Sequence, residues 1–205
     1  MSDDNLEHEG EAMTAPPAIK LPPPPTGGYT ADDLERIPNL PPHTELIDGG
    51  LFFVSPQKDF HTLTLDVLVD GLRRTCPSDL RVRREMSIFI GPQQRPEPDV
   101  VVVKAGAITS REQTCYPAEA VVLAVEVVSP DSEERDRYRK PQLYAQAGIT
   151  HFWRVEDGGE GTIAVYVFEL EPATKTYVAT GVFHGRVKLT VPFTIDIDLS
   201  EIDRL

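Results

Sequence analysis

The chain has 205 residues, of which 40% are hydrophobic and 26% charged, and its formal net charge is −13 at pH 7. This composition is typical of a globular protein with one sizeable core. No stretch contains the roughly 20 apolar residues that a membrane-spanning helix needs. The negative charge argues against a protein that coats nucleic acid by bulk electrostatics, although a metal-loaded site or a local basic cluster can still bind phosphate.

Residues 1–28 are predicted to be a disordered acidic tail, and residues 29–205 one folded domain. The tail is rich in proline, low in hydrophobicity and more acidic than basic, which favours a disordered or extended segment. Its first residues lack the apolar segment of a secretory signal. Cys76 and Cys115 are too few for a disulfide scaffold, so we expect a cytoplasmic protein with two ordinary thiols.

Three elements are predicted in the first part of the domain. Thr30 and Asp33 indicate a capped short helix that ends near Pro38. Residues 44–47 and 51–54 flank an Asp-Gly-Gly turn and predict a β-hairpin. Residues 60–72 place leucine and valine at helical spacing and predict a helix.

The second part of the domain is predicted to be mostly strands with one helix. The helix covers residues 132–147, where Pro141 either kinks it or begins a new helix, and Gly148 caps its end. Strands are predicted for residues 80–90, 99–104, 120–128, 151–155 and 163–168, with further short strands between 175 and 197. This order favours an α/β (α+β mixed) domain in which helices flank a central mixed sheet.

Two acidic residues stand beside dense valine runs. Glu126 lies inside the apolar run 121–128, and Asp99 directly precedes four valines. Such runs indicate strands buried on both faces. An ionised carboxylate there costs several kcal/mol, roughly, unless it is paired, protonated or bound to a metal. We therefore predict that the two carboxylates share a cation, although Asp99 could instead cap a turn and Glu126 could pair with a core arginine.

Magnesium suits such a site because it prefers oxygen ligands. Asp99, Glu126 and the carbonyl oxygen of Val127 are the predicted ligands. Lys140 follows on the predicted helix, which could bring its ammonium group to orient water or stabilise charge on a phosphate. Glu45 of the hairpin is a further polar candidate.

Each of the remaining candidates has a structural explanation beside the functional one. A lysine such as Lys140 is usually a surface residue, and Asp136 is expected to cap or to form an ion pair within its helix. Tyr144 is expected in the core, although its position one turn after Lys140 could bring it to the edge of the site. His61 is either a packed histidine or a residue that lines the site.

Several sequence blocks together resemble the Uma-type family of restriction-endonuclease-like proteins, in the PD-(D/E)xK superfamily. The resemblance runs from about residue 30 to the C-terminus and also includes the hairpin sequence Glu45-Leu46-Ile47-Asp48-Gly49 and His61. The linked blocks are Pro98-Asp99, Val125-Glu126-Val127-Val128-Ser129-Pro130, Arg135-Asp136-Arg137, Lys140, Tyr144-Ala145-Gln146-Ala147-Gly148-Ile149 and Phe152-Trp153-Arg154-Val155.

The resemblance implies a restriction-endonuclease-like core with a divalent-metal nuclease site that uses Mg²⁺ or Mn²⁺. Asp99 matches the metal-binding aspartate, Glu126 its acidic partner and Glu45 the acid of the first hairpin. The superfamily usually places a lysine two residues after the second acid, where this chain has Val128. In the Uma-type pattern that lysine moves to the following helix, where Lys140 matches.

Three functions follow as hypotheses. The first is a magnesium-dependent deoxyribonuclease that hydrolyses DNA phosphodiester bonds, for which Asp99, Glu126, Lys140 and Glu45 are the predicted catalytic residues. The second is a non-catalytic interaction module that retains the nuclease fold. The third is a metal-dependent hydrolase of a small phosphorylated molecule. The resemblance also allows a homodimer, because endonuclease-like folds often dimerise to cut two strands, and no membrane partner is expected.

Overall fold

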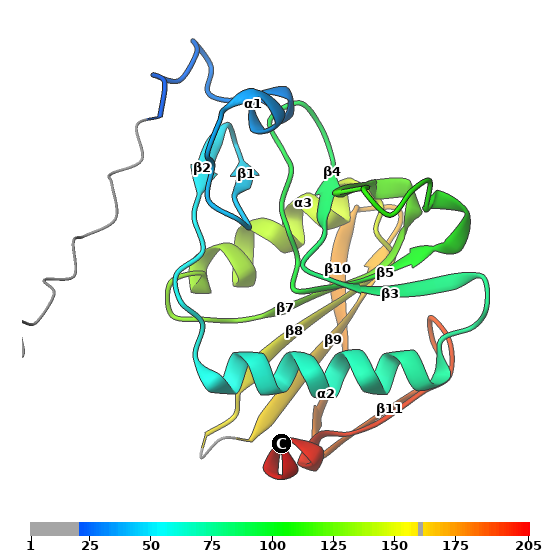
Figure 1. Ribbon diagram of the computed structural model, residues 1–205. Helices are drawn as coiled ribbons and strands as arrows, with labels where there is room; N and C mark the ends of the chain where they lie inside the picture. Colours follow the sequence, from blue (N-terminus) through cyan, green and yellow to red (C-terminus); the bar gives the residue numbers. More distant parts are fainter. Residues whose placement is uncertain (1–20, 160–161) are drawn as a thin grey trace, which may run out of the picture.

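A computed structural model describes residues 21–159 and 162–205 (Figure 1). Residues 1–20 of the predicted tail lie outside the described residues. The helices are α1 (Ala31–Arg36), α2 (Asp59–Thr75) and α3 (Lys140–Gln146), with short 3-10 segments at Ala105–Ala107, Ala118–Ala120 and Leu199–Arg204. The strands are β1 (Glu45–Ile47), β2 (Gly50–Phe52), β3 (Leu80–Arg84), β4 (Ser87–Phe89), β5 (Val100–Lys104), β6 (Cys115–Pro117), β7 (Val121–Val127), β8 (His151–Asp157), β9 (Ile163–Glu171), β10 (Thr176–His184), β11 (Arg186–Leu189) and β12 (Ile195–Asp198).

The centre of the fold is a mixed six-stranded sheet in the order β10-β9-β8-β7-β5-β3. Strands β7 and β8 are parallel, and all other neighbours in this sheet are antiparallel. A mixed central sheet with helices is the predicted architecture, and it is confirmed. Strands β1–β2, β4–β6 and β11–β12 form three small two-stranded sheets around it.

Helices cover both faces of the sheet, which explains why its central strands are valine-rich (Figure 1). On one face, Leu65, Leu68 and Leu72 of α2 pack against Val100 and other residues of the sheet. On the other face, Tyr144 of α3 packs in a cluster that includes the next residue of β5, Val101. Successive residues of a strand point to opposite faces, so a continuous valine run supplies both cores.

Strands β5 and β7 are direct neighbours, which brings the two predicted acids close together. Val100 of β5 pairs with Val125 of β7 in antiparallel register. Asp99 therefore precedes Val100 at the same end of the sheet where Glu126 follows Val125. Alternation along β7 places Glu126 on the α3 side, because its neighbours Val125 and Val127 belong to the core on the α2 side.

The single strand predicted for residues 80–90 is wrong, because two strands replace it. Glu85 has a left-handed backbone, with φ of 50°, and its N–H donates to the carbonyl of Asp99 at 3.0 Å. A residue in this conformation breaks an extended strand. After the break, β4 leaves the central sheet and pairs in parallel with β6.

The segment predicted as one helix over residues 132–147 begins with a π-helix at Arg135–Arg139 and continues as α3. The backbone N–H of Lys140 donates to the carbonyl of Arg135, which is the five-residue spacing of a π turn. Pro141 lies in the first turn of α3, where its missing N–H costs little. Gly148 follows α3 with φ of 84° and confirms the predicted cap.

The N-terminal part of the described chain is attached to the β1–β2 hairpin. α1 has the predicted capping box between Thr30 and Asp33. The N–H of Tyr29 donates to the carbonyl of Gly49 at 2.8 Å, and the hydroxyl of Tyr29 donates to the carbonyl of Pro22 at 2.6 Å. Among the described residues, none of the helices has the length and apolar character needed to cross a membrane.

Candidate active site

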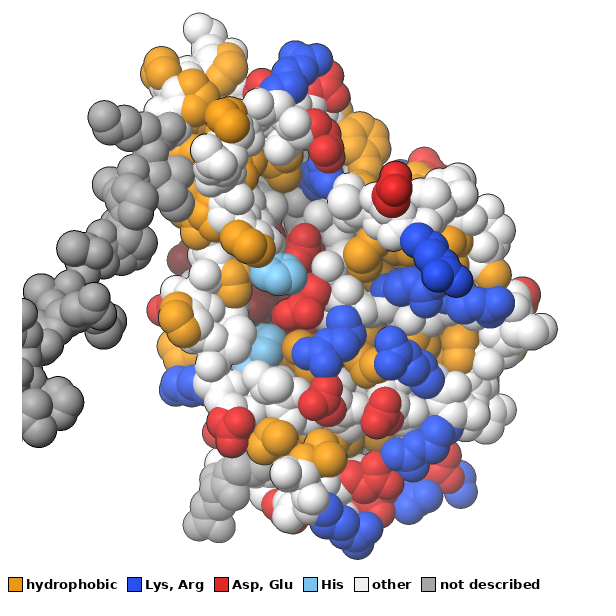
Figure 2. Space-filling view, in the orientation of Figure 1, with side chains coloured by type: hydrophobic (Ala, Val, Ile, Leu, Met, Phe, Trp, Pro, Cys, Tyr) orange, Lys and Arg blue, Asp and Glu red, His pale blue; other side chains and the backbone are white. Residues whose placement is uncertain are grey.

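Acidic and histidine side chains gather in a hollow between the β1–β2 hairpin and the central sheet (Figure 2). Inside it is a cavity of about 60 Å³ whose lining includes Glu45, Asp99, Glu126, Val127 and Lys140. The structure therefore brings together all five residues that were predicted for the site. A wider cleft of about 420 Å³ adjoins the cavity, because Asp99 and His61 line both.

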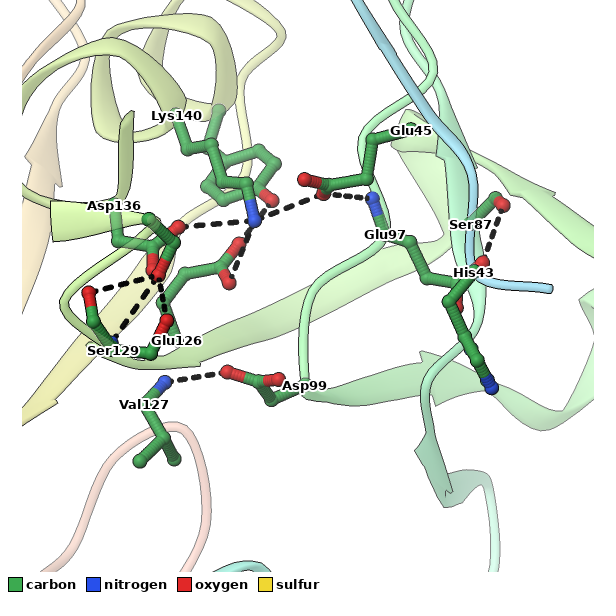
Figure 3. A network of polar contacts seen from close by, with 12 residues as sticks. His43, Glu45, Ser87, Glu97, Asp99, Glu126, Val127, Ser129, Asp136 and Lys140 are labelled. Atoms are coloured by element: carbon green, nitrogen blue, oxygen red, sulfur yellow. Dashed lines mark hydrogen bonds and ion pairs between the residues drawn. The ribbon is translucent and has the colours of Figure 1, made fainter. Parts of the chain in front are cut away.

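Lys140 is at the centre of the site, and its ammonium group contacts three carboxylates (Figure 3). Its Nζ atom lies 2.9 Å from Glu45 Oε1, 3.0 Å from Glu126 Oε2 and 3.0 Å from Asp136 Oδ1. Lys140 is only 3% exposed. The surface position that is usual for a lysine is therefore excluded, and the predicted ion pair of Asp136 within its own helix is confirmed.

The backbone of residues 135–146 explains how three of these side chains share one face. Asp136, Lys140 and Tyr144 follow one another at four-residue spacing, which places side chains on the same side of a helix. Asp136 lies in the π-helix and is its buried residue, and Lys140 follows directly after it. The packing of α3 against the sheet then brings this face to Glu126 of β7.

Glu126 is held by two buried partners, and neither of them is the core arginine that the sequence allowed. Lys140 donates to one carboxylate oxygen, and the hydroxyl of Tyr144 donates to the other, Oε1, at 2.5 Å. Burial raises the pKa of Glu126 well above its ordinary value, against the opposing effect of Lys140, and nearby Asp136 and Asp99 raise it further. Burial therefore makes Glu126 harder to ionise than an exposed glutamate.

The pKa of Lys140 reflects the same excess of negative charge. Burial alone would lower it, but Glu126, Glu45, Asp136 and Asp99 together hold it well above its ordinary value. Burial also raises the pKa of Asp136. The surrounding carboxylates, which outnumber Lys140, thus favour its charged form.

Asp99 binds across to the neighbouring strand and does not simply cap its own turn. Its Oδ2 atom accepts a hydrogen bond from the backbone N–H of Val127 at 2.6 Å. Its Oδ1 atom lies 3.2 Å from Nε2 of His61, a residue of the first turn of α2. The Asp99 side chain is 18% exposed and is therefore open toward the cleft, unlike Glu126.

A second layer of polar contacts holds Glu45, and the sequence did not indicate it. The N–H of Glu97 donates to Glu45 Oε1 at 2.8 Å. The carboxylate of Glu97 contacts His43 Nδ1 at 2.5 Å and accepts from Ser87 Oγ at 3.1 Å (Figure 3). These residues come from three segments far apart in the chain, so no spacing pattern could have predicted the contacts.

The donor set suits a hard divalent cation in charge and in ligand type. Glu45, Asp99, Glu126 and Asp136 surround one ammonium group, which leaves an excess of negative charge for a cation to balance. Their oxygens are the donors that Mg²⁺ and Mn²⁺ prefer. Within residues 21–159 and 162–205, however, no three acidic, histidine or cysteine side chains already stand in metal-binding geometry.

The comparisons with known proteins agree with this architecture. A family model described as "Uma2: Putative restriction endonuclease" matches residues 31–200. A solved structure of a "putative nuclease belonging to DUF820" from Anabaena variabilis ATCC 29413 superposes with a TM-score of 0.62. It is 17% identical and covers 86% of this chain and 93% of its own, which shows a shared fold. No curated protein matches the chain.

The matched region contains the hairpin, the whole six-stranded sheet and every residue that surrounds Lys140. On this match, the chain belongs to the Uma2 family of restriction-endonuclease-like proteins.

Proposed function

We propose that this protein is a divalent-metal-dependent endonuclease that hydrolyses phosphodiester bonds of DNA. The family model is described as "Putative restriction endonuclease", and this supports nuclease activity. The observation that carries the proposal is the cluster of four carboxylates around Lys140, which opens into a cleft through Asp99. A cluster of this kind is costly to bury and therefore favours a functional role.

Asp99, Glu126 and the carbonyl oxygen of Val127 would hold the ion, which we take to be Mg²⁺ or Mn²⁺. A bound ion of this kind supplies a Lewis acid for the phosphate and lowers the pKa of water. The N–H of Val127 and Nε2 of His61 fix both oxygens of Asp99, so that carboxylate is oriented before a ligand arrives. Tyr144 similarly fixes one oxygen of Glu126.

Lys140 has two roles in this proposal. Its ammonium group limits the repulsion among Glu45, Glu126 and Asp136 in the absence of substrate. When a phosphate enters the cleft, the same positive charge would stabilise the negative charge that develops on the phosphate oxygens. Glu45 holds Lys140 from the hairpin side and so determines where this charge lies.

The direct test is cleavage by the purified full-length protein. Supercoiled plasmid should be nicked or linearised with Mg²⁺ or Mn²⁺ and should stay intact with excess chelator. Small phosphodiesters and mononucleotides, tested in parallel, separate a DNA endonuclease from a hydrolase of small phosphorylated molecules. Absence of DNA cleavage with every divalent ion tried would contradict the proposal.

A second candidate function is a non-catalytic interaction module with the nuclease fold. One observation favours it: Lys140 already contacts three of the four carboxylates, as a purely structural ion-pair cluster would. Titration calorimetry separates the two functions, because a structural cluster predicts no Mg²⁺ or Mn²⁺ binding at millimolar ion.

A further inference from the structure

One edge of the central sheet carries a basic strand beside the acidic hollow. Strand β3 has the sequence Leu-Arg-Val-Arg-Arg and is the outermost strand on its side. Figure 2 shows Lys and Arg side chains gathered over β3 and α2, next to the hollow with its acidic and histidine side chains. Arg81 is exposed, and Arg83 and Arg84 are half-buried.

The three arginines differ in how far their charge is neutralised. Arg84 points to the α2 side and contacts Asp66 Oδ1 at 2.6 Å. Arg81 and Arg83 donate only to backbone carbonyl groups of residues 78–82, and no carboxylate of the described chain lies within ion-pair distance of either. Arg81 and Arg83 therefore keep their full positive charge available for an external anion.

Protection of a sheet edge against aggregation is the ordinary explanation for charged residues on an outer strand. The opposite edge of the same sheet tests this explanation. Strand β10 is also outermost and has nine residues, yet its sequence, Thr-Tyr-Val-Ala-Thr-Gly-Val-Phe-His, contains no Lys, Arg, Asp or Glu. The fold thus does not protect its edges with charge in general, and the charges on β3 are all of one sign.

The register of the sheet directs this basic row to the candidate active site. Arg83 pairs with Val101 and Arg81 with Val103, so both arginines share the face of β5 that leads to Asp99. The strand ends where Glu85 N–H donates to the Asp99 carbonyl. With a rise of about 3.3 Å per residue, Arg81 and Arg83 are spaced by about 7 Å along the strand.

We propose that Arg81 and Arg83 form a binding surface for the phosphodiester backbone of duplex DNA. This surface lies on β3, beside the candidate active site, and would hold the DNA close to the phosphodiester bond that is cleaved. This proposal rests on the proposed function. In a chain with a net charge of −13, contact with a polyanion must be local, and this row lies beside the site that would act on it. The guanidinium group suits the contact, because its planar fork can bind two phosphate oxygens at once.

The test measures DNA binding without cleavage, so that it does not depend on catalysis. Full-length protein in chelator is titrated into a fluorescently labelled duplex, and anisotropy gives the binding constant between about 50 and 200 mM salt. Each phosphate contact contributes about 0.9 to the slope of log K against log salt. The double variant Arg81→Gln/Arg83→Gln should therefore lose about 1.8 from the slope, whereas Arg81→Lys/Arg83→Lys should keep it.

Arg186→Gln is the control for loss of an arginine elsewhere, because Arg186 is exposed on β11 outside the central sheet and its charge is paired with Asp196. An unchanged slope in the double variant, an equal change in Arg186→Gln, or no salt-dependent binding of the duplex by the wild type overturns the proposal. Single-stranded DNA and duplex RNA serve as further probes. Tighter binding of either, with the same loss in the double variant, overturns the assignment to duplex DNA.

This experiment is separable from the test of the proposed function. A loss of slope in the double variant of a protein that cuts no DNA leaves the surface standing and the nuclease proposal refuted. If Arg81→Gln/Arg83→Gln cleaves long DNA with an unchanged KM, the nuclease proposal stands and the binding surface is refuted. If both proposals hold, KM for long DNA rises while cleavage of a small phosphodiester is unchanged.

Discussion

The hydroxyl of Tyr144 donates to Glu126 Oε1 across 2.5 Å, and both side chains are almost fully removed from solvent, at 0% and 1% exposure. Replacing Tyr144 by phenylalanine would leave that buried carboxylate oxygen unpaired. Leaving a buried acceptor unsatisfied costs about 1–3 kcal/mol, so the free energy of unfolding in urea should fall by about that amount. Tyr177→Phe is the control, because its hydroxyl donates to the neutral carbonyl of Ile149. A smaller loss in Tyr144→Phe than in Tyr177→Phe would contradict this role of Tyr144.

Removing the ammonium group of Lys140 should destabilise the protein strongly. Lys140→Met leaves Glu45, Glu126 and Asp136 buried without their shared cation. Breaking a buried ion pair from one side costs about 3–5 kcal/mol, measurable by urea denaturation at neutral pH. Lys104→Met is the control: Lys104 is exposed, and the change should stay within about 0.5 kcal/mol. Equal stability of the two variants would show that Lys140 does not hold the cluster together.

The two acids of the proposed metal site should be required for metal binding and for cleavage. Asp99→Asn and Glu126→Gln keep the shape of each side chain and remove its negative charge. Calorimetry should show Mn²⁺ binding weakened at least tenfold, and plasmid cleavage should be lost. Asp70→Asn, an exposed change on α2, should behave as the wild type. Retained cleavage in both site variants would remove the assigned site from consideration.

The contact between His43 and Glu97 should make part of the stability depend on pH. The hydrogen bond that protonated His43 donates to Glu97 raises the pKa of His43 above its ordinary value, despite partial burial. The stabilisation is therefore present below the unfolded pKa of about 6.5 and is lost as the pH rises through the folded value. His43→Asn, which tolerates the left-handed backbone there, should cost more stability at about pH 6 than at about pH 9. His184→Asn, an exposed change, should show no such difference.

Gly148 should be required for its backbone conformation alone. Its φ is 84°, and a methyl group added there would meet no atom within 4 Å. Gly148→Ala should therefore cost about 1 kcal/mol in urea denaturation, because an L side chain disfavours this region. Gly106→Ala meets equally open space without a positive φ, so it should be neutral. An equal loss of stability in Gly148→Ala and Gly106→Ala would contradict the explanation that the positive φ of Gly148 requires a glycine.

The sequence predicts those parts of the fold that rest on local patterns. The valine runs of β5 and β7, the helical spacing of α2 and the capping box of α1 all appear as expected. The break at Glu85 could not be predicted, because glutamate is not a usual residue for a left-handed backbone. That break also hides the pairing of β4 with β6, which joins segments far apart in the chain.

The residues of the site also divide into those that a local pattern predicts and those that only a long-range contact brings in. Asp99 and Glu126 are visible as acids beside buried strands, and Asp136, Lys140 and Tyr144 show a four-residue spacing that predicts one helix face. The contact of Glu45 with Lys140 depends on how the hairpin docks against α3, which no local pattern determines. The position of Lys140 between three carboxylates depends on tertiary packing, so it could be seen only in the structure.

The π-helix at Arg135–Arg139 holds one residue more in its turn than an α-helix would. A relative with one residue fewer between Asp136 and Lys140 would form a regular α-helix there, because an α turn closes on the fourth residue back and a π turn on the fifth. The two charged residues would then stand three positions apart, which still places both side chains on one side of a helix. The ion pair is thus compatible with two chain lengths, and an alignment with such a relative needs its gap inside this turn to keep the acid and the lysine matched.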